Sequence, residues 1–268
     1  MQGLAGGHPR LMRIATWNVN GIRTAWEKGL RDYLTDTAPD VLGVQEVKSS
    51  ISALPPEIVN PPGYRTLWHC GGRPGYSGVG LFIKEELAAQ NLWSVAGMGR
   101  PEVDAEGRML TLELPEFFFV TAYFPNSGEG GRRLDYKLAF CRSMEKFCGN
   151  LERRGKPVLL AGDLNVAPFP IDVFSVQDSS GTAGFLAPER AWLREFLEGP
   201  WVDVFRRDRP EEEGHFTWWS FFDDDRAMNR GWRIDSFLAS AAFAPRVRCE
   251  IHAHVMGSDH CPVLATIS

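Results

Sequence analysis

The 268-residue sequence predicts an α/β fold in which two β-sheets pack together and helices flank them. Apolar runs of four to seven residues recur and end in polar residues or glycine, which is typical of strands buried on both faces. A few longer segments have the periodicity of amphipathic helices. Because no linker or repeat interrupts this pattern, we expect one domain over residues 13–268, preceded by a flexible leader over residues 1–12.

Six of the apolar runs are expected to form strands. The run Phe-Phe-Phe-Val-Thr-Ala-Tyr at 117–123 shows the bias most clearly, because aromatic and β-branched side chains favour strands. The six runs are residues 41–44, 79–83, 117–123, 158–161, 234–238 and 263–267.

Three segments are expected to form helices, at residues 24–37, 132–154 and 188–197. Gly155 and Pro157 end the second, and Pro188 suits the first turn of the third. The side chains expected to face inward are Trp26, Leu30, Tyr33 and Leu34 in the first segment, and Phe140, Met144, Phe147 and Leu151 in the second.

The composition, 44% hydrophobic and 24% charged, is ordinary for a soluble globular protein. No run reaches the roughly 18 apolar residues of a membrane span, and residues 1–10 lack the apolar core of a signal peptide. Cys141 and Cys148 are expected on one helix, about 10 Å apart, too far to bridge. Five scattered cysteines without a Cys-x-x-Cys pair favour a reducing, cytoplasmic location.

The net charge of −5 argues mildly against a nucleic-acid partner, but its distribution weakens that objection. Residues 203–226 hold eight acidic residues and four arginines, a net charge of −4, so the rest of the chain carries only −1. A metal site would also need acidic residues of its own. The net charge therefore leaves the partner open.

Four polar clusters border apolar runs, and together they predict one metal-assisted hydrolytic site. The most informative is Gly-Ser-Asp-His-Cys-Pro at 257–262, which places Asp259 and His260 just before the last expected strand. The other three are Trp17-Asn18-Val19-Asn20, Gln45-Glu46-Val47-Lys48 and Gly162-Asp163-Leu164-Asn165.

Asp163 and Asn165 follow a buried strand, and functional groups of α/β sheets gather at strand ends. Asp163 could accept a proton from water, and Asn165 could orient that water or a phosphate oxygen. The alternative is an Asx turn that merely ends the strand.

Glu46 also ends an apolar strand, where a carboxylate is costly unless it is paired or metal-bound. Mg²⁺ fits such a group, since it takes one or two carboxylates and leaves positions for substrate phosphate. The alternative is a surface ion pair with Lys48 or an arginine. Asn18 and Asn20 offer amides to phosphate oxygens or metal-bound water, although Asn20 could instead cap the following helix.

Asp235 interrupts an otherwise apolar strand and therefore needs a partner. His260 is the natural one, because the carboxylate would fix the imidazole tautomer and stabilise its charged form. The alternative is a structural ion pair between Asp235 and an arginine.

Two further segments are candidates for substrate contacts. The Gly-rich residues 71–80 lack the Gly-Lys-Ser/Thr of a P-loop and are expected to form a turn, from which Tyr76 could touch a substrate. Trp218 and Trp232 flank the strand of Asp235 with arginines nearby, and such aromatics can wall an extruded sugar. Trp219 is expected in the core.

In their order along the chain, these motifs resemble those of the exonuclease III type of apurinic/apyrimidinic endonuclease, in the endonuclease/exonuclease/phosphatase superfamily. The resemblance runs from about residue 13 to residue 268. The motifs that carry it are Asn18, Gln45-Glu46-Val47-Lys48, Tyr76-Ser-Gly-Val-Gly80, Thr121-Ala-Tyr123-Phe-Pro-Asn126, Gly162-Asp163-Leu164-Asn165, Gly231-Trp232-Arg-Ile-Asp235 and Gly257-Ser-Asp259-His260-Cys-Pro262.

The resemblance implies a four-layer α/β sandwich and Mg²⁺-dependent hydrolysis, with Mn²⁺ able to substitute. It implies incision on the 5′ side of abasic sites in duplex DNA, trimming of blocked 3′ ends and 3′→5′ exonuclease activity, by a monomer without a membrane partner. By position it assigns the metal to Glu46, Asn20 and Asp259, catalysis to Asp163, Asn165, Tyr123, Asp235 and His260, and substrate binding to Asn18, Asn126, Lys48, Tyr76, Trp218, Trp232 and Ile234.

The motifs leave open whether Asp163 or the Asp235–His260 pair is the general base. Two departures concern DNA affinity, because Glu129 stands where some relatives have a basic residue and residues 223–225 are acidic. The alternatives to a repair nuclease are a phosphatase of the same superfamily and a non-catalytic nucleic-acid-binding relative. The full set of catalytic side chains disfavours the second alternative, and the Gly-Trp-Arg-Ile-Asp motif disfavours the first.

Overall fold

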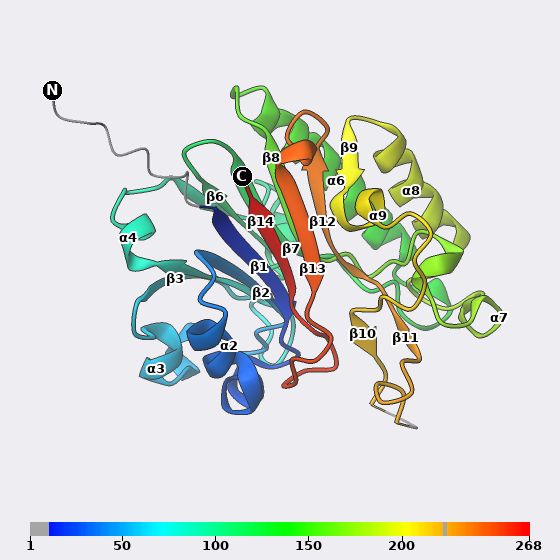
Figure 1. Ribbon diagram of the computed structural model, residues 1–268, viewed down its shortest axis with the longest axis horizontal. Helices are drawn as coiled ribbons and strands as arrows, with labels where there is room; N and C mark the ends of the chain where they lie inside the picture. Colours follow the sequence, from blue (N-terminus) through cyan, green and yellow to red (C-terminus); the bar gives the residue numbers. More distant parts are fainter. Residues whose placement is uncertain (1–10, 222–223) are drawn as a thin grey trace, which may run out of the picture.

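The computed structural model describes residues 11–221 and 224–268, in which two six-stranded β-sheets face each other (Figure 1). Helices cover the outer face of each sheet, so these residues form the predicted four-layer α/β sandwich. Residues 1–10 of the predicted leader lie outside the described residues. Strand β1 opens at Met12, one residue before the predicted start of the domain.

The first sheet has the strand order β13–β14–β1–β2–β4–β3, and the second has the order β5–β6–β7–β8–β12–β9. A two-stranded ribbon, β10–β11, lies beside them. The strands are β1 (Met12–Asn18), β2 (Val41–Gln45), β3 (Tyr64–His69), β4 (Val79–Lys84), β5 (Ser94–Ala96), β6 (Met109–Glu113), β7 (Phe118–Tyr123), β8 (Val158–Asp163), β9 (Trp201–Asp203), β10 (Trp218–Trp219), β11 (Gly231–Trp232), β12 (Asp235–Ser240), β13 (Val247–Ile251) and β14 (Val263–Ile267).

The three predicted helices are present, and shorter helices and turns join the strands. The first prediction corresponds to α1 (Ile22–Ala25), the π-helical turn η1 (Trp26–Leu30) and α2 (Arg31–Asp36), the second to α6 and the third to α8. The others are η2 (Ile51–Ala53), α3 (Pro56–Val59), α4 (Glu85–Ala88), α5 (Pro101–Asp104), η3 (Glu129–Gly131), α6 (Leu134–Glu152), η4 (Pro170–Asp172), α7 (Val176–Ser179), α8 (Ala187–Glu198), α9 (Val204–Asp208) and η5 (Ala244–Arg246).

Three apolar layers hold the sandwich together. The largest lies between the two sheets, a second between the second sheet and helices α6 and α8, and a third between the first sheet and residues 22–36. The predicted inward faces are buried, except that Phe147 is only partly buried while Cys141 and Cys148 are fully buried. Helix α6 packs against both β8 and α8, and two neighbours widen the buried face beyond a single stripe.

The five cysteines, all within the described residues, carry free thiols. Four are buried and Cys70 is half-buried, and burial raises the pKa of Cys141 to about 12. Among the described helices, none is both long and apolar enough to cross a membrane.

The topology brings the ends of four strands to one edge of the sandwich. β1 runs parallel to β2 with Asn18 opposite Gln45, and β7 runs parallel to β8 with Tyr123 opposite Asp163. β12 runs antiparallel to β8 and begins at Asp235, also opposite Asp163. Residues that end β1, β2, β7 and β8 and begin β12 therefore meet at one place.

Candidate active site

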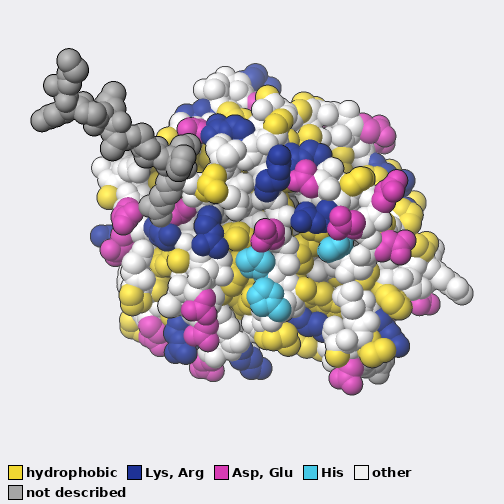
Figure 2. Space-filling model, viewed as in Figure 1, with side chains coloured by type: hydrophobic (Ala, Val, Ile, Leu, Met, Phe, Trp, Pro, Cys, Tyr) yellow, Lys and Arg dark blue, Asp and Glu magenta, His cyan; other side chains and the backbone are white. Residues whose placement is uncertain are grey.

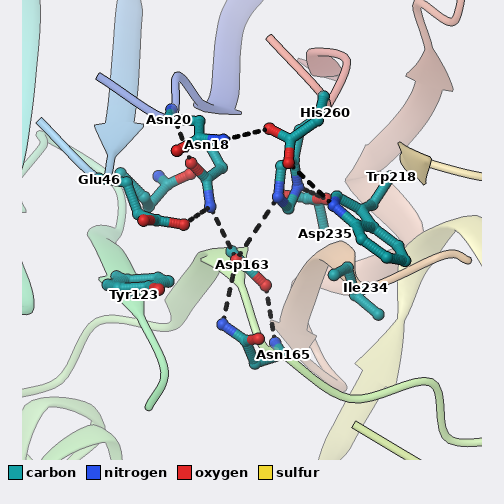
Figure 3. A network of polar contacts seen from close by, with 12 residues as sticks. Asn18, Asn20, Glu46, Tyr123, Asp163, Asn165, Trp218, Ile234, Asp235 and His260 are labelled. Atoms are coloured by element: carbon teal, nitrogen blue, oxygen red, sulfur yellow. Dashed lines mark hydrogen bonds and ion pairs between the residues drawn. The ribbon is translucent and has the colours of Figure 1, made fainter. Parts of the chain in front are cut away.

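Asp163 lies at the centre of the site, at the end of β8 (Figure 3). Its Oδ2 accepts hydrogen bonds from the Asn18 side chain at 2.8 Å and from the Asn165 side chain at 3.1 Å. Its Oδ1 accepts from the Asn165 backbone N–H at 2.7 Å. The bond from the Asn165 backbone N–H to Asp163 is the one expected of an Asx turn that merely ends the strand. The same carboxylate also bonds Asn18 of the other sheet, which such a turn does not require.

The charge environment of Asp163 disfavours its ionised form. Burial, followed by the nearby Asp235 carboxylate, raises the pKa of Asp163 to about 7, although the His260 imidazolium opposes this rise. A carboxylate whose pKa lies near neutrality can exchange a proton with water at physiological pH.

Asn165 is fixed on all sides by hydrogen bonds. Its side-chain N–H₂ also donates to the Phe124 carbonyl at 3.0 Å, and its Oδ1 accepts from Asn126 at 3.0 Å. Its backbone carbonyl accepts from the Lys137 ammonium, which forms a buried ion pair of 2.7 Å with Glu189. Asn165 can hold this position because asparagine tolerates its positive φ of 52°.

Asp235 and His260 form the predicted pair, with 2.8 Å between Asp235 Oδ2 and His260 Nδ1. The Thr217 hydroxyl donates to the same Oδ2 at 2.7 Å and accepts from the backbone N–H of Asp235. The alternative of an Asp235–arginine pair is wrong, since the neighbouring Arg233 contacts Asp172 and Asp203 instead.

The second nitrogen of His260 faces the centre of the site. His260 Nε2 lies 4.0 Å from Asp163 Oδ2, so the imidazole stands between two carboxylates (Figure 3). Burial alone would lower the pKa of His260, but Asp235 and then Asp163 outweigh burial and raise it to about 10. The ring is therefore charged at neutral pH and donates hydrogen bonds.

Glu46 lies across the site from His260, just after β2. Its Oε1 accepts a hydrogen bond of 2.9 Å from the Asn18 side chain, whose N–H₂ group also bonds Asp163. Its Oε2 forms an ion pair of 2.8 Å with Lys48, as the alternative interpretation of Glu46 expected.

Burial and then the charge of Glu46 raise the pKa of Tyr123 well above its ordinary value, so the phenol keeps its proton.

Asn20 and Asp259 bind each other at the same side of the site. Asn20 Nδ2 donates to Asp259 Oδ1 at 2.9 Å, and Asn20 Oδ1 accepts from Lys48. Asp259 Oδ2 accepts from the Trp218 indole N–H at 3.1 Å. The alternative role of Asn20 as a helix cap is wrong, because Gly21 occupies the N-cap position and no side chain caps helix α1.

The residues present fit a divalent metal ion. Within the described residues, one group of ligand atoms from Glu46, Asp163 and His260 lies within 4.8 Å of one another. Of these three, the Glu46 and Asp163 carboxylates suit Mg²⁺, a hard cation, whereas the charged His260 ring has no lone pair for a metal. The Lys48 ammonium bonds Glu46 and Asn20, so a positive charge already occupies the side of the site where the metal is predicted.

An apolar wall borders the site beside His260. Trp218, Trp232 and Ile234 belong to one small cluster, with the two indoles edge to face at 6.0 Å between ring centroids. Both indoles are partly exposed, whereas Trp219 is 2% exposed and belongs to the core, as expected. Cys261 is buried, and burial raises the pKa of its thiol, so it packs and does not act as a nucleophile.

Tyr76 does not join the central group. Its hydroxyl accepts from Arg108 at 2.7 Å and from Arg133, and it donates to Glu106. Residues 71–78 form a turn before β4, as predicted. Arg108 links Tyr76 to the centre, since its guanidinium lies 4.7 Å from the Tyr123 ring centroid.

Three polar residues that shape the site were not predicted from the sequence: Thr217, Lys137 and Arg226. Lys137 left a visible signal, because it lies three residues before Phe140, on the apolar stripe of its helix, where a charge needs a buried partner. Thr217 and Arg226 have no such signal in the sequence, because their partners are distant along the chain and meet them only in the fold.

Comparison with known proteins agrees with this geometry. Residues 15–260 match the model of the Endonuclease/Exonuclease/phosphatase family. The chain is 38% identical to the DNA repair nuclease APEX1 of Danio rerio over 96% of this chain and 82% of that protein. It is 38% identical to the exodeoxyribonuclease of Bacillus subtilis (strain 168) over 94% of this chain and 98% of that protein.

Solved structures share the fold. The AP endonuclease LMAP from Leishmania major superposes with a TM-score of 0.87 at 30% identity, covering 96% of this chain and 88% of that one. An AP endonuclease from Archaeoglobus fulgidus superposes with a TM-score of 0.82 at 25% identity, covering 96% and 99%. The resemblance found in the sequence motifs is confirmed, and the chain belongs to the endonuclease/exonuclease/phosphatase family.

Proposed function

We propose that the protein is a Mg²⁺-dependent DNA-repair nuclease that hydrolyses the phosphodiester on the 5′ side of abasic sites in duplex DNA. It would also trim blocked 3′ ends and remove nucleotides from 3′ to 5′. The observation that carries the proposal is the single Asn18 amide group that bonds both Glu46 and Asp163, with the charged His260 beside them. The names of the matched relatives support DNA as the substrate.

The geometry supports Asp163 as the general base. With carboxylates on two sides, His260 keeps its proton, whereas Asp163 is held by two asparagines in a position to take a proton from water. Asn165 would orient that water. His260, Asn126 and Tyr123 would then donate to oxygens of the phosphate as its negative charge grows. Asn18 would join them once its N–H₂ group releases one of its two present acceptors, Glu46 or Asp163.

Glu46 would hold the metal, with Asn20 and Asp259 as the further predicted ligands on that side. Bound there, a divalent cation would neutralise charge on the phosphate and on the departing oxygen. Lys48 would remain beside the phosphate as a second positive charge. Mn²⁺ has the same preference for oxygen ligands and would substitute for Mg²⁺.

The bond changes follow from these positions. The water oxygen bonds to phosphorus as Asp163 takes one of its protons, and the bond from phosphorus to the 3′ oxygen of the preceding nucleotide breaks. That oxygen takes up a proton and becomes a 3′-hydroxyl, while the phosphate stays on the abasic sugar. Water is thereby added across one P–O bond.

Trp218, Trp232 and Ile234 would line the place of the extruded abasic sugar. A sugar without a base is small enough to meet this wall, and the apolar surface would exclude water around it. Tyr76 would contact the DNA strand away from the scissile phosphate, together with its partners Arg108 and Arg133.

The net charge of −5 shows that the protein is not strongly basic. Figure 2 shows Lys and Arg side chains interspersed with acidic ones on the face that it presents. Affinity would therefore come from local phosphate contacts more than from a long-range field. We propose that the protein acts as a monomer in the cytoplasm.

The test is incision of a duplex with a tetrahydrofuran abasic analogue, with Mg²⁺ and with EDTA, beside an undamaged duplex with recessed 3′ ends. A Mg²⁺-dependent nick 5′ to the analogue supports the proposal, and its absence refutes it. Release of phosphate from inositol phosphates without nicking would point to a phosphatase. Binding without turnover would point to a non-catalytic protein.

Variants test the assigned roles. Asp163→Ala and His260→Ala should each slow incision by about 100-fold or more. His215→Ala is the matched control for His260→Ala, because His215 is only partly buried and pairs with Glu212 outside the site. Full activity in either site variant would contradict its role.

A further inference from the structure

The segment that leads into Asp259 and His260 has no regular secondary structure. Residues 252–258 connect β13 to the end of the site, and Ala253, His254 and Met256 are exposed. On one side the segment touches Gly29, where a Cβ atom would lie 2.2 Å from the Met256 carbonyl oxygen. Its position must be set by contacts with other parts of the chain.

One side chain, Arg226, contacts three backbone carbonyls of this segment. Its Nη1 donates to the Ser258 carbonyl at 2.8 Å, and its Nη2 donates to the Ala253 carbonyl at 3.0 Å and to the Val255 carbonyl at 2.6 Å. The planar guanidinium can serve several acceptors at fixed angles, which the single ammonium of lysine cannot. Arg226 therefore fixes both ends of the segment at once.

Arg226 belongs to the connection between β10 and β11, the ribbon that carries Trp218 and Trp232. Its guanidinium lies 4.6 Å from the Trp219 ring centroid. The backbone N–H of Trp219 donates to the Asp259 carbonyl at 3.0 Å. Trp219, on which Arg226 stacks, is thus hydrogen-bonded directly to Asp259 of the site.

Ser258 continues the connection on the other side. Its carbonyl accepts from Arg226, while its hydroxyl donates to the Asn18 carbonyl at 2.8 Å and accepts from the His260 backbone N–H at 3.2 Å. Ser258 therefore connects Arg226 directly to both Asn18 and His260.

We infer that Arg226 is a positioning residue of the nuclease, which sets Asp259 and His260 by holding residues 253–258 against the β10–β11 ribbon. It acts through this segment and contacts none of the residues assigned to the reacting phosphate. The inference rests on the proposed function. It predicts that loss of Arg226 slows turnover more than it weakens DNA binding.

Arg230 provides a matched control. It lies in the same connection, it is exposed, and its substitution by glutamine removes the same charge. A residue that only attracts DNA would change KM and the salt dependence of binding, and Arg226→Gln would then behave like Arg230→Gln. A positioning residue would change kcat.

The experiment compares wild type, Arg226→Gln, Arg226→Lys and Arg230→Gln in incision of the abasic duplex, with kcat and KM measured separately. Arg226→Gln should lower kcat by about 10-fold to 100-fold, since small displacements of catalytic groups have effects of this size. Arg226→Lys should recover only part of kcat, and Arg230→Gln should keep it. Unchanged kcat in Arg226→Gln, or equal losses in the two glutamine variants, would overturn the inference.

Hydrogen exchange supplies a readout that needs no activity. The backbone amides of residues 253–259 should exchange faster in Arg226→Gln and Arg226→Lys than in wild type, and at the wild-type rate in Arg230→Gln. Unchanged exchange in the Arg226 variants would also overturn the inference. An inactive wild type would instead refute the proposed function, so the two failures are distinguishable. If Arg226→Gln does not fold, Arg226→Lys carries both measurements.

Discussion

Replacement of Arg233 by methionine should destabilise the protein strongly. The Arg233 side chain is fully buried, and it contacts Asp172 Oδ1 at 2.7 Å, Asp203 Oδ2 at 2.8 Å and Ser236 Oγ at 3.0 Å. Arg206 also contacts Asp172 Oδ1 at 2.7 Å. Methionine fills much of the volume but leaves two buried carboxylates with less positive charge.

The size of the loss follows from this arrangement. Removing one partner of a buried ion pair costs about 3–5 kcal/mol, because the remaining charge stays in a medium of low polarity. Since Arg206 still serves Asp172, the lower half of that range is expected. At about 2–4 °C per kcal/mol for a chain of this size, the melting temperature should fall by about 6–16 °C.

Urea unfolding at pH 7.5 measures the loss, with the exposed Arg230→Met as the control. Adding Asp203→Asn to the Arg233→Met variant should recover part of the stability, since it removes the charge of the carboxylate that has lost its arginine partner. A loss below about 1 kcal/mol in Arg233→Met, or a full additional loss in the double variant, would contradict a stabilising role for this buried ion pair.

The same variant should be more sensitive to acid. Burial would raise the pKa of Asp172, but Arg233 and then Arg206 outweigh burial and lower it. A lowered pKa stabilises the fold above the ordinary carboxyl pKa, and this stability is lost as the pH falls through the lowered value. Arg233→Met should therefore unfold at a higher pH than wild type.

Two further predictions concern the site. Trp218→Phe keeps an aromatic wall but removes the indole N–H that bonds Asp259, and kcat/KM should fall by about 10-fold, the effect of one hydrogen bond to a charged group. Wild-type kinetics would show that the wall alone matters. The second prediction uses Asp163, whose pKa burial and the charge of Asp235 raise to about 7. In EDTA, ionisation of the buried Asp163 lowers the free energy of unfolding as the pH rises toward 7, and this loss is complete above pH 7. A bound Mg²⁺ would offset the negative charge, so Mg²⁺ should raise the melting temperature more at pH 8 than at pH 5.5. Equal shifts at both pH values would contradict a cation beside this carboxylate.

Much of the sandwich was predictable because its strands are short, apolar and end in polar residues. The runs at 158–161 and 234–238 predicted β8 and β12, and the polar residues at their ends predicted which edge would hold the site. The isolated Asp235 in an apolar run also predicted its own partner, since only a few residues can neutralise a buried carboxylate.

The remaining contacts depend on distances that local patterns do not encode. Thr217 meets Asp235 only because β10 pairs with β11, which brings the residue before β10 next to the start of β12. Arg226 meets its three carbonyls only after two loops fold against each other. The contacts of Lys48 could not be predicted either, because the sequence allowed Glu46 to be an ion-pair partner or a metal ligand. In the structure Lys48 bonds both Glu46 and Asn20.

The position of β14 makes assembly of the active site depend on the synthesis of a strand far along the chain from β1. This last strand lies between β13 and β1, and the Trp17 indole donates to the His260 carbonyl across 243 residues of sequence. A ribosome delivers β1 long before β14, so the first sheet keeps an open seam until β14 has emerged. A chain whose synthesis has not yet reached His260 and β14 therefore has no assembled cleavage centre.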